Sequence, residues 1–303
     1  MYASLAAAPG GPIFAEAPRI MANGDRRFGI PPPNLLFTRT IDEVATWVKP
    51  QLEQGPIELS IFGDSRWEAA TEAVAKTLGA LPARSSLQKP FDQTFNTPKP
   101  RTSAYVYTTA PQLSQVAVAR FCPIRAPFTI HQERRCRMLA ELMTERLRLR
   151  LREEFGAAYN SSASLVQYEG FKGLLYFILY AEVSSSDALR ASKLIKNELD
   201  ALRKKQFTDD EFARIKAPFL RHRDEDLPNN SYWTFTVLRD AQQRPERLNA
   251  ARDRSADTVA ITRRDLEKLA KRHLDPARSF EFVAYPAPTK AEATEPTFPL
   301  ALQ

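Results

Sequence analysis

The stretch LREEFGAAYNSSAS, residues 151–164, decides the fold because a helix ends and a strand begins within it. Apolar residues at helical spacing lie just before it: Leu139, Leu142, Met143 and Leu147. This stripe predicts one long helix over residues 130–155, and Gly156 stands where a glycine commonly ends a helix. Residues 159–168 then have the composition of a strand. We therefore expect a helix-to-strand junction at the centre of the chain.

The segments on both sides of this junction predict a layered fold. Upstream, we expect helices over residues 40–52 and 66–78, a strand over residues 57–62 between them, and strands over residues 102–108 and 114–121. Downstream, we expect a strand over residues 174–183, helices over residues 186–205, 208–224, 230–243 and 262–273, and a last strand over residues 280–285. Helices gathered in runs favour an α+β fold, with a mainly antiparallel sheet of about six strands and helices packed on one face.

Composition divides the chain into three parts. Residues 1–40 are rich in proline and glycine, and predict a short helix followed by an irregular connector. Residues 41–286 predict one domain, which is long enough to bury a substantial core. Residues 287–303 combine threonine, proline and charged residues, so we expect a disordered tail.

The overall composition excludes several classes of protein. Hydrophobic residues make up 43% and charged residues 26%, which is ordinary for a folded globular chain. No apolar run approaches the roughly 20 residues of a membrane-spanning helix, and the N-terminus lacks the basic region of a secretory signal. The glycines form neither a GxGxxG nor a GxxxxGKS/T pattern, so the usual phosphate-binding loops are missing. The compartment in which the protein works stays open.

The residues that usually bind metals or act as nucleophiles are few and scattered. Cys122 and Cys136 lack CxxC spacing, so we expect inert, buried thiols. His131, His222 and His273 stand far apart, and none begins an HxxEH or HExxH motif. We therefore expect no metal ion and no cofactor in this chain.

Several further motifs occur in a recognisable order around LREEFGAAYNSSAS. They are IELSIFGD at residues 57–64, TLGALPAR at 77–84, QFTDDEFARIKAPFL at 206–220, NNSYWTFTVL at 229–238 and TRRDLEKLAKRHLDPAR at 262–278. Together they resemble the non-catalytic C-terminal domain of the pitrilysin/insulinase family of zinc metallopeptidases, the inverzincins. The segment before them, GDRRFGIPPP, resembles the end of the domain that precedes this one in full-length members.

This resemblance implies a role in peptide hydrolysis that the chain does not perform alone. Family members hold zinc with an HxxEH helix, which this sequence lacks, so zinc is expected in a partner half. The resemblance implies that Arg152 and Tyr159 are substrate-binding residues, whose guanidinium and phenol hold the backbone carbonyls of an unfolded peptide. It also implies a closed chamber, in which a peptide can add a strand to a sheet edge.

Other interpretations of the same residues are open. From spacing alone, Arg152 complements the negative end of a helix and Tyr159 is a half-buried strand aromatic. The run RLRLRLR at residues 146–152 could mark a nucleic-acid-binding helix, but nearby glutamates favour a solvated, ion-paired face. We therefore expect neither nucleic acid nor membrane as a partner. For the whole chain, the alternatives are a catalytically inactive assembly subunit of the same fold and a truncated gene product.

Overall fold

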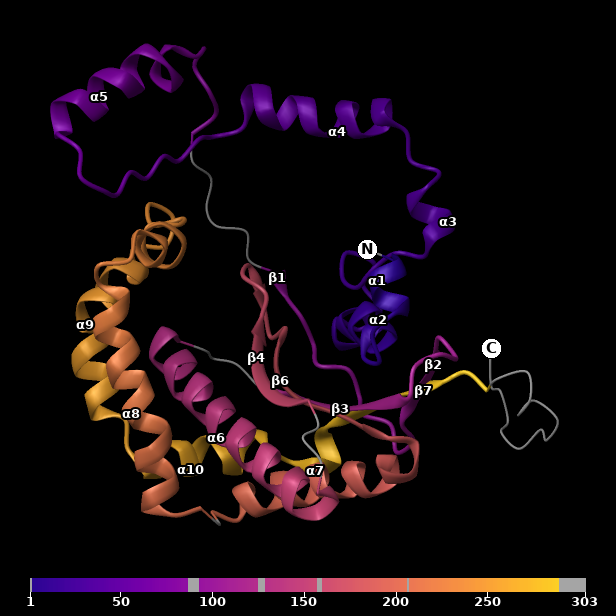
Figure 1. The fold of residues 1–303 in the computed structure, drawn as a ribbon. Helices are drawn as coiled ribbons and strands as arrows, with labels where there is room; N and C mark the ends of the chain where they lie inside the picture. Colours follow the sequence, from indigo (N-terminus) through magenta and orange to yellow (C-terminus); the bar gives the residue numbers. More distant parts are fainter. Residues whose placement is uncertain (1, 87–92, 125–128, 157–159, 206, 289–303) are drawn as a thin grey trace.

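A five-stranded mixed sheet forms the centre of the protein (Figure 1). The computed structural model describes residues 2–86, 93–124, 129–156, 160–205 and 207–288. The strands of the sheet are β2 (Tyr105–Thr109), β3 (Gln115–Pro123), β4 (Ser161–Gln167), β6 (Leu175–Ser184) and β7 (Phe280–Pro286). Their order is β2-β7-β3-β6-β4, and each neighbouring pair is antiparallel except β2 with β7. The short strands β1 (Gln93–Thr94) and β5 (Phe171–Lys172) pair separately.

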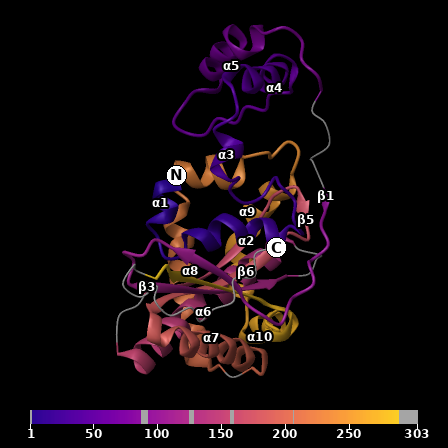
Figure 2. The same cartoon turned by 90° about the vertical axis from the view of Figure 1, so that its right-hand side faces the viewer.

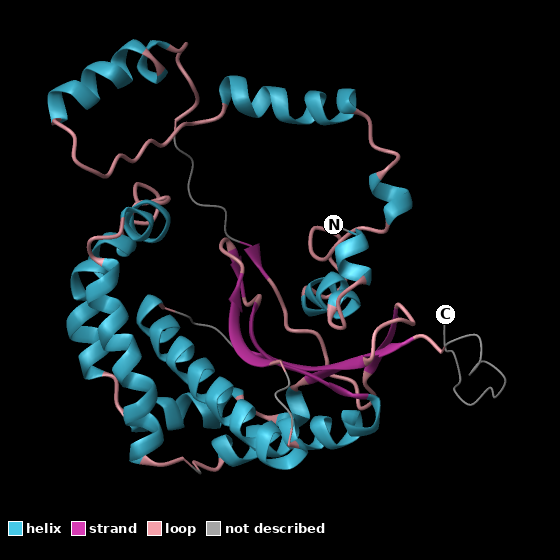
Figure 3. Cartoon of the chain, in the orientation of Figure 1, coloured by secondary structure: helices cyan, strands magenta, loops and turns pink. Residues whose placement is uncertain are grey.

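Helices supply most of the remaining regular structure (Figure 3). They are α1 (Tyr2–Ala6), α2 (Gly11–Met21), α3 (Pro33–Leu36), α4 (Ile41–Gln54), α5 (Trp67–Lys76), α6 (Ile130–Phe155), α7 (Ala188–Arg203), α8 (Asp209–Asp226), α9 (Glu246–Ala260) and α10 (Arg263–His273). A π-helical turn, η3 (Tyr232–Val237), lies between α8 and α9. The expected α+β class is therefore confirmed. Within the described ranges, no helix has both the length and the apolarity needed to cross a bilayer.

Helices α6, α7 and α10 cover one face of the sheet. Helix α6 begins where the sequence predicts because Thr129 and Gln132 form a capping box, in which each side chain accepts a hydrogen bond from the other residue's amide. Leu139 of α6 and Phe177 of β6 are both fully buried and belong to the same core cluster. Burial of this apolar surface is the main favourable contribution to folding.

The opposite face of the sheet is covered by α2 (Figure 2), which corrects the expectation that helices pack on one face only. Ile13 and Ala17 of this helix are fully buried, and Met21 is 3% exposed. They belong to a second core cluster that includes Ala117 and Ala119 of β3. Because successive strand residues point to opposite faces, these two alanines lie on the same face. Their small side chains leave room for a helix to approach the sheet.

The sheet has five strands and not six because the predicted strand at residues 57–62 does not join it. Those residues have no regular secondary structure, and within the described part of the chain they form no backbone hydrogen bond to another strand. They lie between α4 and α5, which stand apart from the sheet at the top of Figure 1. Neither helix contains a buried residue.

The predicted helix over residues 230–243 is also different in the structure. Its central part forms the π-helical turn η3, and a longer helix, α9, follows. Helix α9 was not predicted from the sequence, because Ala250 and Thr258 are its only buried residues and no apolar stripe marks the helix.

The predicted divisions of the chain stay predictions. The regular pattern expected from Thr40 does begin there, since Thr40 caps α4 in a capping box with Glu43. The boundaries after residues 40 and 286 are not established by this feature. Of the predicted tail, residues 289–303 lie outside the described residues.

The hydroxyl of Thr144 in α6 forms hydrogen bonds with the backbone of β4, the strand at one edge of the sheet. The Ala163 amide donates a hydrogen bond to Thr144 Oγ1 at 2.8 Å, and the same hydroxyl lies 3.0 Å from the Ala163 carbonyl oxygen. The amide of this edge residue is therefore satisfied by a side chain of α6, and the single hydroxyl hydrogen lies within reach of the carbonyl oxygens of both Ala163 and Ala140. A strand that paired with β4 at this edge would have to displace the Thr144 side chain from Ala163.

We expect Thr144→Val to lower the free energy of unfolding by about 1–2 kcal/mol, because the Ala163 amide loses its acceptor. Thr144→Ser keeps the hydroxyl and should recover most of this loss. Unfolding in urea measures both variants. The control is Thr71→Val, on exposed α5, whose hydroxyl donates to Trp67 within its own helix; it should change stability by less than about 0.5 kcal/mol. Equal losses at the two sites would contradict the prediction.

Candidate functional site

The last turn of α6 presents Arg152 to solvent. The helix ends because Gly156 adopts a φ of 67°, in the left-handed region, and its amide donates to the Arg152 carbonyl oxygen at 2.9 Å. The negative end of the helix dipole favours a cation at this position. The local sequence therefore places a guanidinium at the predicted helix-to-strand junction.

Arg152 differs in its partners from other arginines of the same run. Arg146 pairs with Glu198 and Glu211, and Arg150 also pairs with Glu198. In contrast, the Arg152 guanidinium has no hydrogen-bond or ion-pair partner among the described residues. An exposed guanidinium with all its donors open to solvent can bind an acceptor on another molecule.

The alternation RLRLRLR places its arginines on two sides of the helix. Because side chains four residues apart share a face, Arg146 and Arg150 lie on one side, and Arg148 and Arg152 on the other. Two buried leucines separate these sides: Leu147 and Leu151. Arg148 is exposed and, in the part of the chain that is described, also has no ion-pair partner. Arg148 was not predicted as a candidate from the sequence, although its spacing of four residues from Arg152 is the signal that identifies it.

Tyr159, the other predicted substrate-binding residue, lies outside the described residues. Its position relative to Arg152 therefore stays a prediction. The described chain resumes at Asn160, whose carbonyl oxygen accepts a hydrogen bond from the Glu182 amide at 2.9 Å, and β4 begins at Ser161. The helix end and the strand start on either side of Tyr159 are thus both fixed by backbone hydrogen bonds.

The described residues do not assemble a metal or nucleophile centre. They contain no group of three or more His, Cys, Asp or Glu side chains that could hold a metal ion. His131 Nδ1 lies 3.1 Å from a carboxylate oxygen of Asp257, which gives this imidazole a structural partner. Burial raises the pKa of both the Cys122 and the Cys136 thiols to about 12, so they are protonated at neutral pH. The donor set of the described residues therefore does not fit zinc.

Asp257 is the centre of an ion cluster that joins the start of α6 to α9. Its carboxylate lies 2.9 Å from both Arg134 and Arg135, in addition to the contact with His131. Burial alone would raise the pKa of Asp257, but hydrogen bonds from the two arginines and the histidine lower it overall. The first arginines of α6 therefore have a structural role.

The family is established by its sequence profile. The profile described as "Peptidase M16 inactive domain" matches residues 39–219, which is more than half of the chain. The chain therefore belongs to the Peptidase M16 inactive domain family, and its resemblance to pitrilysin/insulinase peptidases is confirmed. No curated protein matches the sequence.

Several solved structures are similar to this chain. A conserved protein from Enterococcus faecalis V583 is 16% identical, with a TM-score of 0.74, over 95% of this chain and 66% of that chain. A peptidase M16 inactive domain from Pseudomonas fluorescens is 15% identical, with a TM-score of 0.72, over 94% and 67%. The periplasmic protease PqqL from Escherichia coli is 16% identical, with a TM-score of 0.68, over 94% and 31%. These identities show a shared fold alone, and this chain spans about two thirds of the Enterococcus protein and a third of PqqL.

Proposed function

We propose that this chain is the non-catalytic, substrate-binding half of a zinc metallopeptidase whose other half carries zinc on an HxxEH helix. Membership in a family of inactive peptidase domains supports this context. The observation that carries the proposal is the Arg152 guanidinium, which is exposed at the end of α6 and has no partner within the described ranges.

In this proposal, Arg152 donates hydrogen bonds to backbone carbonyl oxygens of a bound peptide. A guanidinium carries five N–H donors in a planar fork, which suits oxygen acceptors. Such a donor becomes more stabilising when negative charge develops on the carbonyl oxygen during hydrolysis. Tyr159 follows the helix end closely in sequence and would add a phenol donor. Because every peptide has backbone carbonyls, these contacts favour an unfolded peptide without a strict sequence preference.

An inactive assembly subunit of the same fold is the second candidate function. Exposed apolar side chains are consistent with it, as they are with the first proposal, since Ile41, Trp47 and Trp67 are each at least 75% exposed. Apolar surface of this kind marks contact with another protein. Both candidate functions need such a contact, so peptide hydrolysis distinguishes them.

The deciding experiment is reconstitution with the zinc-bearing, HxxEH-containing chain of the same family from the same genome. We expect this chain alone to hydrolyse no peptide, and the mixture to cleave an unfolded fluorogenic peptide. The initial rate of fluorescence release is measured for each chain separately and for the two together. A zinc-bearing chain that is equally active by itself contradicts the proposal. A stable complex that cleaves nothing supports the assembly subunit instead.

A further inference from the structure

Arg148 is an exposed residue of α6 for which the proposed substrate site has no role. It lies four residues before Arg152, so the two guanidiniums are neighbours on one side of the helix. Like charges at this spacing repel each other unless an anion compensates them. Neither side chain has an ion-pair partner among the residues that the structure describes. The pair is therefore an uncompensated positive charge that an anionic ligand would stabilise.

The glutamates near this pair are already engaged with other side chains. Three of them lie within one helical turn of Arg148 or Arg152, and each forms an ion pair with a different arginine: Glu145 with Arg214 at 2.9 Å, Glu153 with Arg150 at 3.2 Å, and Glu154 with Arg190 at 3.1 Å. The helix thus supplies carboxylates to other arginines and leaves these two guanidiniums open. This distribution favours a carboxylate from another molecule as their partner.

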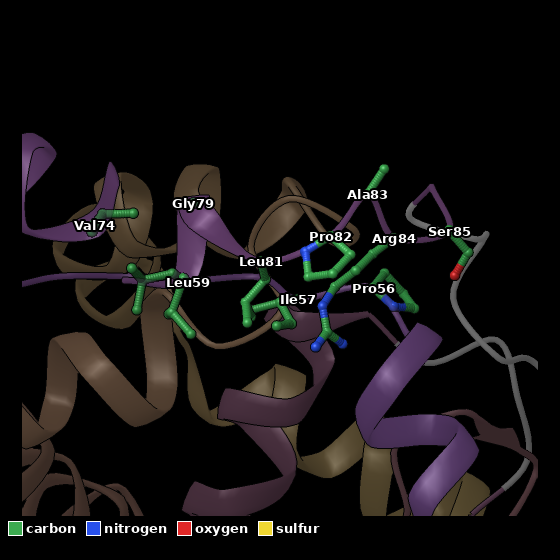
Figure 4. Close-up of a pocket in the computed structure, with 11 residues that line it drawn as sticks. Pro56, Ile57, Leu59, Val74, Gly79, Leu81, Pro82, Ala83, Arg84 and Ser85 are labelled. Carbon is green, nitrogen blue, oxygen red and sulfur yellow. The ribbon is translucent and has the colours of Figure 1, made fainter. Parts of the chain in front are cut away.

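An arginine elsewhere in the chain shows the contrast. A groove of about 440 Å³ lies between residues 56–59 and 78–85, and Arg84 is a charged side chain in its wall (Figure 4). Arg84 Nη1 donates to the backbone carbonyl oxygens of Leu52 and Gly55, at 2.6 and 3.1 Å. This guanidinium is held by the backbone of its own chain, whereas those of Arg148 and Arg152 have no such partner within the described ranges.

The pair lies on the side of α6 that borders the edge strand β4. Thr144 stands four residues before Arg148 on this side, and its hydroxyl accepts a hydrogen bond from the Ala163 amide of β4. Strand β4 is the last strand of the sheet in this direction (Figure 1). Arg148 and Arg152 continue the same side of α6 toward the end of the helix. A peptide that reaches Arg152 along this border therefore also passes Arg148.

The two arginines differ in their distance from the helix end. Arg152 lies in the last turn, whose backbone carbonyls carry partial negative charge and disfavour an anion. Arg148 lies one turn earlier, where this effect is weak because it is confined to the last turn. A neutral backbone carbonyl therefore suits Arg152, and a full carboxylate suits Arg148.

We propose that Arg148 binds a carboxylate of the peptide substrate, which makes it a specificity-determining residue. The inference rests on the proposed function, because it extends the peptide contact of Arg152 by one helical turn. Four residues of helix rise about 6 Å, and two residues of an extended peptide span about 6.6 Å. The carboxylate therefore lies about two residues from the carbonyl that Arg152 holds. An acidic side chain or the C-terminus of the peptide supplies it, and the planar fork of a guanidinium matches either group.

Calorimetry tests this contact on the full 303-residue chain without a partner. Three unfolded peptides share one sequence: the first has a single glutamate and an amidated C-terminus, the second has glutamine and a free C-terminus, and the third has glutamine and an amidated C-terminus. We expect at least one of the first two to bind about 10-fold more tightly than the third, as a hydrogen bond to a charged group provides. Arg148→Gln should remove this difference. Arg150→Gln is the control and should keep it, because Arg150 pairs with Glu153 and Glu198.

The peptide that gains affinity identifies the source of the carboxylate. Equal Kd values for all three peptides in the wild-type chain overturn the inference. An equal loss of affinity for all three in Arg148→Gln also overturns it, because the role of Arg148 is then structural. If Arg148→Gln instead weakens the complex with the HxxEH-containing chain and leaves peptide discrimination intact, the guanidinium belongs to the contact between the two halves, and the inference is wrong.

Steady-state kinetics of the reconstituted enzyme give the second readout. We expect kcat/KM to be highest when the glutamate stands about two residues from the cleaved bond. The charge of this carboxylate does not change during hydrolysis, so the preference should appear in KM and not in kcat. A preference in kcat alone, or equal kcat/KM values for every position of the glutamate, overturns the inference. Calorimetric discrimination by Arg148 in a mixture that hydrolyses nothing contradicts the proposed function and leaves the carboxylate contact in place.

Discussion

Arg152→Ala is expected to lower peptide turnover by the reconstituted enzyme about 100-fold, as the loss of one well-placed donor to a reacting carbonyl does. The free energy of unfolding should change by less than about 0.5 kcal/mol, because the side chain is exposed and has no partner within the described residues. Arg152→Lys keeps the charge without the planar fork, so we expect intermediate turnover. Steady-state rates and urea unfolding measure these effects.

The matched control is Arg150→Ala. Arg150 lies two residues earlier on the same helix, and its side chain is 57% exposed, but it pairs with Glu153 and Glu198. Turnover should stay at the wild-type level in this variant. An equal loss at both positions would assign the effect to the general positive charge of the helix and not to a specific contact. Wild-type turnover in Arg152→Ala would contradict the proposed role of this residue in substrate binding.

Ile13→Ala is expected to lower the free energy of unfolding by about 3 kcal/mol, which is usual for truncation of a fully buried isoleucine. Ile13 is 0% exposed and packs, through α2, on the face of the sheet opposite to α6. The loss combines lost apolar burial with the cavity that remains. A loss of this size would show that residues 1–40 are not only a connector, because α2 would then be a packed layer of the fold.

Ile41→Ala is the control for this effect, because it makes the same chemical change at a side chain that is 79% exposed. Its stability should change by less than about 0.5 kcal/mol. Chemical denaturation of the two variants under the same conditions gives the comparison. If Ile13→Ala were as mild as Ile41→Ala, α2 would not be a packed part of the domain.

The elements with strong local signals were predicted from the sequence. Helix α6 begins and ends where the sequence predicts, because the Thr129 capping box and Gly156 act through neighbouring residues. The position of Arg152 at the helix end follows from the same local rules. These features depend on a few consecutive residues, so they do not require knowledge of the tertiary fold.

The features that were missed depend on contacts between distant segments. Nothing within residues 11–21 shows that α2 packs on the second face of the sheet, because that contact depends on the alanines of β3. Residues 57–62 have the pattern of a strand, but pairing requires a neighbour that this chain does not supply within its described ranges. The partnerless state of Arg148 likewise depends on where the glutamates of α7 and α8 lie.

The two buried cysteines have a practical consequence for following movement in this protein. Burial raises the pKa of both thiols, so they are protonated at neutral pH, and neither cysteine is exposed to a maleimide in solution. The two native cysteines should therefore not react with a thiol label in the folded protein, so only cysteines introduced by mutation are labelled. Fluorophores on cysteines introduced at the surfaces of α5 and α9 would report the distance between these helices, with no native thiol to replace.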